Sequence, residues 1–184
     1  MGRTFEEIDS DLAGWIESQP MFFVSTAPSG NGGHINVSPK GGTGLFKVLG
    51  PRTFAYLDLV GSGAETIAHV RENGRIVAMF CAFQGPPKVI RLHGRGRVTE
   101  LGDEEFESKL RQIGPPDDYL LLARSVVEIE VERIADSCGF MVPQLSLDQE
   151  RQQLMRWAEN QLQRNGSDWK ASYLQANNRQ SIDG

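Results

Sequence analysis

A glycine-serine-glycine loop is the clearest candidate for chemistry in this sequence. It lies in the stretch YLDLVGSGAET, from Tyr56 to Thr66, where an expected strand runs into an expected helix. Gly61 and Gly63 would let the oxygen atoms of a ligand approach the backbone, and the first amides of a helix are unpaired and partly positive. Ser62 and Thr66 add hydroxyl donors, so the pattern indicates a phosphate-binding site, which we call the phosphate seat.

The same loop has a simpler interpretation, a strand-to-helix turn in which Ser62 caps the helix. It is not a Walker loop, because no lysine follows its second glycine, and it does not match the GxGxxG fingerprint. Asp58 and Asn73 flank the loop and the helix that follows it. Each of these two side chains is either a helix cap or a ligand contact.

Lys40 is the second candidate for a functional residue. It follows the expected strand HINVS and stands between Pro39 and the pair Gly41 and Gly42. Rigid backbone on both sides would place its ammonium group beside the anionic edge of a ligand. A surface lysine in a turn explains the same position, so the residue by itself leaves both interpretations open.

A strand with alternating basic residues is the third candidate. In KVIRLHGRGRV, residues 88–98, alternate positions share one face, so the basic side chains would lie opposite Ile90 and Leu92. A bulge at Gly94 or Gly96 would break this alternation, and a solvated face explains the charges as well. The basic face comprises Arg91, His93, Arg95 and Arg97.

The other polar residues do not form a constellation that demands a reaction. No Ser/His/Asp triad and no carboxylate pair points to hydrolysis, and the three histidines fall in different elements without metal-ligand spacing. Cys81 and Cys138 form no CxxC pair, which favours a reduced, cytoplasmic location. The segment DSCGFMVP, residues 136–143, either lines a pocket or reverses the chain.

Composition bounds the class of protein. The 184 residues include 24 acidic and 19 basic side chains, for a net charge of −5, which argues against a general nucleic-acid binder. A hydrophobic content of 39% is enough for a real core. No apolar run is long enough to cross a bilayer, and the N-terminus has acids where a signal peptide would be basic.

Residue periodicity predicts a mainly β protein, a small β-barrel with peripheral helices. We expect a helix over residues 1–20 packed on the barrel, the barrel itself over 21–143, and a C-terminal helix with a polar tail over 144–184. The continuous apolar stretch 75–83 predicts a strand buried on both faces. Expected strands cover residues 21–27, 34–38, 44–49, 53–59, 75–83, 88–98 and 124–134. Expected helices cover residues 4–20, 64–74, 103–113 and 147–166, with loop beyond Gly166.

The order of these pieces resembles the pyridoxamine 5'-phosphate oxidase-like, FMN-binding split-barrel family. HINVSPKG, then FAYLDLVGSGAETIAHVRENGRIVAMFCAF, then KVIRLHGRGRV carry the resemblance, which covers roughly residues 22–143. DSCGFMVP and the tryptophan-bearing helix after it resemble one branch of this family. No single motif is decisive, but the ordered set is fairly specific.

The resemblance implies a Greek-key split barrel that forms a homodimer, with FMN in a groove at the subunit interface. It also implies two groups of cofactor-binding residues and one basic position, Arg91. The strand along the isoalloxazine ring would carry Val37, Ser38, Pro39, Lys40 and Gly41. The phosphate and ribityl chain would be held by Asp58, Gly61, Ser62, Gly63 and Thr66.

The sequence departs from the oxidase in two places. The oxidase grips the phosphate with an arginine-lysine pair where this chain has Gly-Ser-Gly-Ala-Glu-Thr, so backbone amides and hydroxyls, helped by Arg91 or Arg95, would have to replace that charge. The oxidase's substrate-phosphate determinants have no clear match in WKASYLQANNRQSIDG, which argues against pyridoxamine phosphate as the substrate.

Two functions are compatible with these residues. The first is an FMN-dependent oxidoreductase acting on an unknown small molecule, in which Lys40 stabilises the anionic reduced flavin near its N1/O2 edge. The second is a non-catalytic dimer that carries flavin, deazaflavin or haem as a sensor or carrier. The missing acid/base constellation keeps the second function open.

Overall fold

The computed structural model describes residues 2–30, 32–177 and 181–182 of the chain. Its strands pair into a single antiparallel sheet. The strands are β1 (Thr4–Phe5), β2 (Met21–Thr26), β3 (Asn36–Gly41), β4 (Phe46–Gly50), β5 (Thr53–Leu59), β6 (Arg75–Cys81), β7 (Val89–Glu100) and β8 (Ala123–Ser137). The helices are α1 (Ser10–Glu17), α2 (Glu65–Asn73), α3 (Phe106–Ile113), the 3-10 helix η1 (Asp117–Leu122), α4 (Gln153–Asn165) and α5 (Trp169–Asn177).

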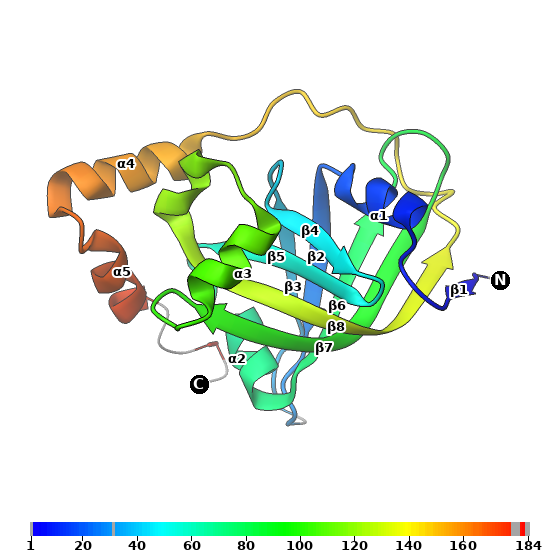
Figure 1. Ribbon diagram of the computed structural model, residues 1–184, viewed down its shortest axis with the longest axis horizontal. Helices are drawn as coiled ribbons and strands as arrows, with labels where there is room; N and C mark the ends of the chain where they lie inside the picture. The colour runs from blue at the N-terminus through cyan, green and yellow to red at the C-terminus, as the bar shows by residue number, and fades with distance from the viewer. Residues whose placement is uncertain (1, 31, 178–180, 183–184) are drawn as a thin grey trace.

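The sheet curls into a half-barrel with helices around it, which confirms the predicted fold class (Figure 1). Its strand order is β3-β2-β6-β7-β8-β5-β4, and the short β1 pairs with β8. β3 and β4 therefore lie at the two ends of the order. Where the sheet curls, β3 lies opposite β5 and α2, and side-chain hydrogen bonds join them. We call this line of contact the seam.

The first helix is shorter than predicted. The sequence pattern indicated a helix from Thr4, but Thr4 and Phe5 instead form β1, which pairs with Ile134 and Ala135 of β8. The helix begins at Ser10, because the carboxylate of Asp9 accepts a hydrogen bond of 2.8 Å from the amide of Leu12 and caps it.

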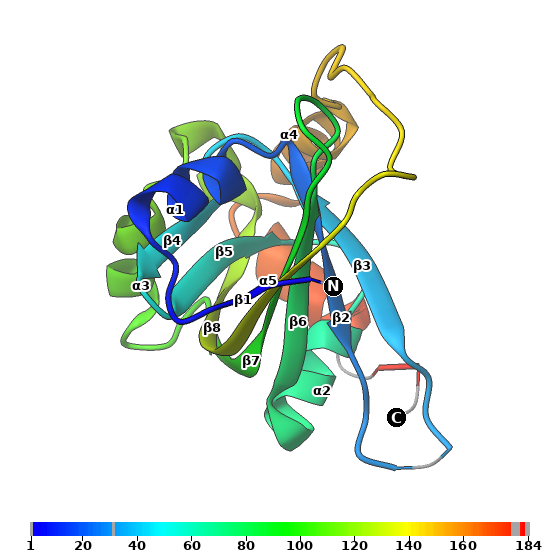
Figure 2. The same cartoon turned by 90° about the vertical axis from the view of Figure 1, so that its right-hand side faces the viewer.

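The second predicted strand is displaced towards its C-terminal end. Residues 34 and 35 precede β3, and Pro39 and Lys40, expected just after the strand, lie within it. Pro39 has no amide proton to donate, and it is tolerated because β3 is at the end of the strand order. Consequently Asn36, Ser38 and Lys40 alternate on the inner face of β3, while Val37, Pro39 and Gly41 are exposed. Figure 2 shows the β2–β3 hairpin reaching past the rest of the sheet.

The predicted irregularity near Gly94 is present, but the extra residue lies in β8. His93 pairs with Arg133 and Gly94 pairs with Val131, so Glu132 is left between them. The alternation of β7 is therefore kept, and Arg91 and His93 remain on one face of the sheet. The strand β6 buries only one face; Val77 and Met79 on the other are half-buried, contrary to the expectation for residues 75–83.

The main core fills the inside of the curled sheet. Phe22 is 1% exposed, and its ring centroid lies 4.9 Å from that of Phe46 and 5.1 Å from that of Phe80. Leu12 and Ile16 of α1 belong to the same core. Such aromatic contacts add to the free energy gained by burying apolar area.

β5 is buried on both faces, and this determines where its polar residue points. Ala55 and Leu57 face α3, where they pack with Phe106. Because successive side chains of a strand alternate, Tyr56 and Asp58 face the interior of the half-barrel. The strand thereby carries a carboxylate into the inner side of the seam.

The C-terminal region contains a helix where a loop was expected beyond Gly166. In α5, Trp169 is 3% exposed and its ring centroid lies 5.3 Å from that of Trp157 in α4. The polar residues around this tryptophan obscured the helix in the sequence. Residues 178–180 and 183–184 of the predicted tail lie outside the described residues. No helix in the described ranges has the length and apolar character needed to span a membrane.

Gly94 lies beside the bulge, where the backbone of β8 comes too close for a side chain. A Cβ at this position would lie 2.0 Å from the backbone oxygen of Glu130. Gly94→Ala is therefore expected to lower the free energy of unfolding by about 2 kcal/mol or more in urea denaturation. Gly32→Ala is the control, because nothing lies within 4 Å of its added Cβ. Equal stabilities of the two variants would contradict this packing.

Candidate functional site

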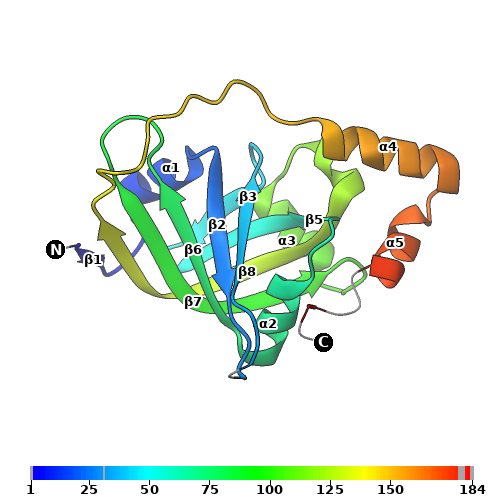
Figure 3. The ribbon, with the colours of Figure 1, turned by 180° about the vertical axis from the view of Figure 1, so that it is seen from behind.

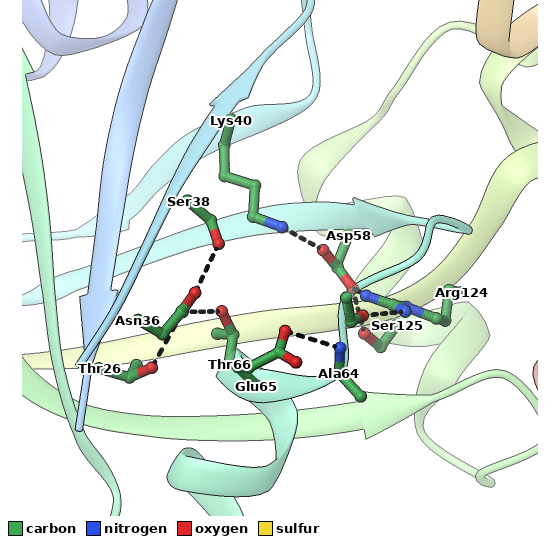
Figure 4. A network of polar contacts seen from close by, with 11 residues as sticks. Thr26, Asn36, Ser38, Lys40, Asp58, Ala64, Glu65, Thr66, Arg124 and Ser125 are labelled. Carbon is green, nitrogen blue, oxygen red and sulfur yellow. Dashed lines mark hydrogen bonds and ion pairs between the residues drawn. The ribbon is translucent and has the colours of Figure 1, made fainter. Parts of the chain in front are cut away.

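An ion pair joins the two sides of the seam. The ammonium nitrogen of Lys40 in β3 donates to Oδ1 of Asp58 in β5 at 2.8 Å (Figure 4). The Asp58 side chain is 3% exposed and that of Lys40 is 23% exposed. A buried carboxylate needs such partners, because desolvation penalises an unpaired charge strongly.

Arg124 is a member of this cluster that the sequence analysis missed. Its Nε donates to Oδ2 of Asp58 at 2.8 Å, and one of its terminal nitrogens donates to the carbonyl oxygen of Gly63 at 2.8 Å. Its side chain is 8% exposed. An arginine at the start of the alternating stretch RSVVEIEVERI was a signal, because a buried arginine requires a carboxylate partner. Two cations thus share one carboxylate, and the cluster carries a net positive charge.

A chain of amide and hydroxyl groups continues along the seam. The amide nitrogen of Asn36 donates to the hydroxyl of Thr66 at 2.9 Å and to that of Thr26 at 3.1 Å. Ser38 donates to the amide oxygen of Asn36 at 2.9 Å (Figure 4). The hydroxyl of Thr26 also pairs with Nδ1 of His69 at 3.0 Å. Predicted residues Ser38, Lys40, Asp58 and Thr66 are therefore brought together, and Asn36 joins them unpredicted.

Tyr56 places a polar atom at the bottom of this site. Its side chain is 1% exposed, and its hydroxyl has no hydrogen-bond partner among the described residues. The ammonium of Lys40 lies 5.9 Å from the centroid of its ring. Burial, followed by the nearby charge of Asp58, raises the pKa of Tyr56 well above its ordinary value. The phenol therefore stays protonated and is able to donate.

A small cavity lies against these groups. Its volume is about 250 Å³, and its lining includes Lys40, Tyr56, Asp58 and Gly61. We call it the seam cavity. Buried polar atoms normally have partners, so the unpaired hydroxyl of Tyr56 beside an open space is the feature here that calls for a ligand.

The glycine loop lies beside the seam, and Ser62 and Gly63 are exposed. Ser62 does not cap α2, because the capping position is Ala64, which makes no side-chain cap. Instead, the carboxylate of Glu65 accepts a hydrogen bond from the Ala64 amide at 3.1 Å. This places an acidic group of the chain at the position where an external anion would bind.

Several predicted residues do not meet this cluster within the chain. Val37 is on the exposed face of β3, and Pro39 and Gly41, although largely exposed, line the edge of the seam cavity. Arg91 lies on the opposite face of the sheet, where it donates to the hydroxyl of Ser137 at 2.9 Å. Asn73 holds the β2–β3 loop through a 2.8 Å bond to the carbonyl oxygen of Ala27.

A second, larger cavity lies next to the first. It measures about 520 Å³ and is covered by residues 145–151, which we call the strap. Figure 3 shows the chain crossing the open end of the sheet before it enters α4. The amide of Leu145 donates to the carbonyl oxygen of Phe83 at 2.9 Å and fixes one end of the strap. We call this space the strap cavity.

Glu150 fastens the other end of the strap. Its carboxylate accepts from the hydroxyl of Thr43 at 2.7 Å, from the amide of Thr43 at 2.8 Å and from the hydroxyl of Tyr119 at 2.8 Å. These bonds, led by that of the Thr43 hydroxyl, lower the pKa of Glu150 from its ordinary value. Burial, together with the bond to Glu150, raises the pKa of Tyr119 to about 12. We call the three hydrogen bonds of Glu150 the strap latch. Its carboxylate is charged at neutral pH, so these bonds are intact there.

Comparison with known proteins begins with the fold. No model of a known protein family matches the chain. A conserved hypothetical protein from Mycobacterium tuberculosis superimposes with a TM-score of 0.51 at 13% identity, covering 77% of this chain and 92% of that one. An FMN-binding protein from Syntrophomonas wolfei superimposes with a TM-score of 0.50 at 15% identity, covering 77% and 91%. At such identities the likeness shows the fold alone, a split barrel.

Sequence similarity then identifies the family. A pyridoxamine 5'-phosphate oxidase family protein from Aspergillus flavus is 44% identical over 144 residues, which are 78% of this chain and 57% of the relative. The chain belongs to the pyridoxamine 5'-phosphate oxidase family, as the resemblance of its motifs predicted. It spans little more than half the length of that relative.

The ion-pair cluster predicts a ranking of stabilities. Asp58→Asn leaves Arg124 buried without a counter-charge and is expected to cost about 3–5 kcal/mol of unfolding free energy. Lys40→Met preserves the Asp58–Arg124 pair, and since Lys40 is partly exposed we expect a cost of about 1 kcal/mol. Urea denaturation of both variants measures the difference. A Lys40→Met variant as unstable as Asp58→Asn would contradict the dominant role of Arg124.

The strap latch predicts a pH dependence. A carboxyl whose folded pKa is depressed contributes stability above its unfolded pKa and loses it as pH falls through the folded value. Glu150→Gln should therefore cost about 1 kcal/mol at pH 7, and this cost should disappear on acidification below the ordinary value of 4.5. Thermal unfolding at several pH values measures it, with the exposed Glu159→Gln as control. A cost that does not change with pH would exclude the charged latch.

Proposed function

We propose that the protein binds flavin mononucleotide along the seam and uses it as an FMN-dependent oxidoreductase. The observation that carries this proposal is the seam itself. It combines a cluster of net positive charge, an unpaired buried hydroxyl and an exposed glycine-serine-glycine loop, in a chain of the pyridoxamine 5'-phosphate oxidase family. The FMN-binding protein with the same fold supports the choice of flavin.

The residues present fit such a ligand. The hydroxyl of Tyr56 and the donors of Lys40 that Asp58 does not use are suited to the polar edge of a ring. The exposed backbone around Ser62 and the hydroxyl of Thr66 are suited to a phosphate and its chain. Arg124 supports the site from behind, since it holds both Asp58 and the carbonyl of Gly63.

The chain's own residues would bind and tune the cofactor. FMN, when bound, supplies hydride and electron transfer. Lys40 would place positive charge near the flavin edge that becomes anionic on reduction, and Asp58 fixes the position of that charge. Tyr56 would orient the ring by donating its proton in a hydrogen bond. The substrate would be a small molecule.

A homodimer would complete the site. Ile35 and Val37 of the β2–β3 hairpin are 74% and 62% exposed, and these two apolar side chains suit contact with a second copy. Pro39 and Gly41 line the seam cavity of their own chain, whereas Val37 and Arg91 face away from it and would act across such an interface. We also propose a cytoplasmic location and no nucleic-acid or membrane partner.

The experiment that tests this function is reduction of the bound cofactor. Protein purified with FMN should show a flavin spectrum that bleaches anaerobically with NADPH or a substrate and recovers in air. A flavin that binds but never turns over would favour a sensor or carrier, and a deazaflavin or haem spectrum would replace FMN. A protein that takes up none of these cofactors would end the proposal.

The phosphate seat predicts opposite effects of two variants. Ser62→Ala with Thr66→Ala removes hydroxyl donors and should weaken FMN binding about tenfold. Glu65→Gln removes the chain's own anion from the Ala64 amide and should strengthen binding. Titration by flavin fluorescence measures both dissociation constants. If the double variant binds FMN as wild type does, the phosphate lies elsewhere.

Lys40 predicts a change in reduction potential. Lys40→Ala should lower the two-electron potential of bound FMN by roughly 30 mV or more, which is about 1.4 kcal/mol, because the anionic reduced form loses its counter-charge. Lys47→Ala is the matched control, since Lys47 is exposed on β4. Equal potentials in the two variants would remove Lys40 from the flavin edge.

A further inference from the structure

We propose that the strap cavity is the substrate site and that it accepts an uncharged, largely apolar small molecule. This inference rests on the proposed flavin function and names its substrate class. The space is defined by one chain, since it lies between the ends of β2 and β3, η1, the strap and α4. A cavity of about 520 Å³ is in the range that holds a small molecule.

The strap cavity adjoins the proposed cofactor site. Gly41, Leu59 and Leu154 line both the strap cavity and the seam cavity. A molecule in the larger space would therefore lie next to a ring placed against Lys40 and Tyr56. This adjacency is what a two-electron transfer between substrate and flavin requires.

The lining of the strap cavity indicates an uncharged ligand. Met21, Phe83 and Leu122 contribute apolar surface from three separate segments, and the strap adds Leu145 and Leu147. The apolar side chains would desolvate a phosphate or carboxylate without replacing its water.

The charged residues of the lining do not offset that cost. Glu150 is held by Thr43 and Tyr119, and the adjacent Arg151 is exposed. The two have opposite charges, so the cavity has no excess of positive charge for an anion. The site therefore differs in chemistry from one built for a phosphorylated substrate.

The walls of the strap cavity are already ordered. The Leu145 amide is bonded to Phe83, and the Glu150 carboxylate is bonded to Thr43 and Tyr119, so both ends of the strap are fixed. A ligand would bind without having to order this segment, which lowers the entropic cost of binding.

Binding of an uncharged fluorescent probe, N-phenyl-1-naphthylamine, tests the proposal without requiring turnover. The probe should bind wild type at one molecule per chain. Leu145→Arg and Leu147→Arg place a charge in the lining and should each weaken binding at least tenfold. Met141→Arg is the matched control, because Met141 is 94% exposed and does not line the cavity; its affinity should stay within twofold of wild type.

Two further measurements test the ligand class and the adjacency. 1-Naphthol should displace the probe, and 1-naphthyl phosphate at the same concentration should not. With FMN bound, saturating probe should shift the visible flavin absorption. Equal displacement by the phosphate ester, unchanged affinity in both arginine variants, or an unshifted flavin spectrum would each overturn the proposal.

Failure of the flavin proposal would be seen separately. FMN affinity is titrated in wild type and in Leu145→Arg, Leu147→Arg and Met141→Arg, and it should be the same in all of them because none of the substituted residues lines the seam cavity. Wild type that fails to bind FMN contradicts the proposed function, and the substrate assignment with it. If wild type binds FMN but the probe binds both arginine variants as tightly as wild type, only the substrate site is overturned.

Discussion

The pairing of one buried carboxylate with two cations is the constraint on which the site depends. Asp58 must point into the half-barrel, because the other face of β5 packs on α3. A carboxylate that is 3% exposed is stabilised there chiefly by the buried Arg124 from β8, with a smaller contribution from Lys40 of β3. The end strand β3, which pairs with β2 through its backbone, is thus joined to β5 by side chains, and polar atoms line the seam.

This way of closing the sheet leaves a place for a ligand. The seam retains the unpaired hydroxyl of Tyr56 and the donors of Lys40 that Asp58 does not use. The carboxylate of Glu65 accepts a hydrogen bond from the Ala64 amide, beside the glycine loop where we propose that the phosphate binds. Ligand binding would then exchange an internal anion for an external one, which makes affinity sensitive to that single side chain.

The strap covers a second cavity, whose lining differs in chemistry from that of the seam. The seam is polar and contains a cluster of net positive charge, whereas the strap cavity is mostly apolar and has balanced charges. Gly41, Leu59 and Leu154 form the boundary between them. A charged cofactor would be bound by the polar seam, and an uncharged substrate by the apolar strap cavity. The two molecules would thus have separate sites within one domain.

Local signals in the sequence were enough to predict strands at β2 and at β4 to β8, the helix ended by Gly74, the irregularity near Gly94 and the family, whereas β1 was missed and β3 was displaced. They also singled out Lys40, Asp58 and the glycine loop, because charged and glycine residues interrupt otherwise regular patterns. The tertiary structure decided that Asn36 and Arg124 belong to the same cluster and that Arg91 lies on another face. The physical reason is that local periodicity determines which face of a strand a side chain occupies, whereas the curl of the sheet determines which faces meet.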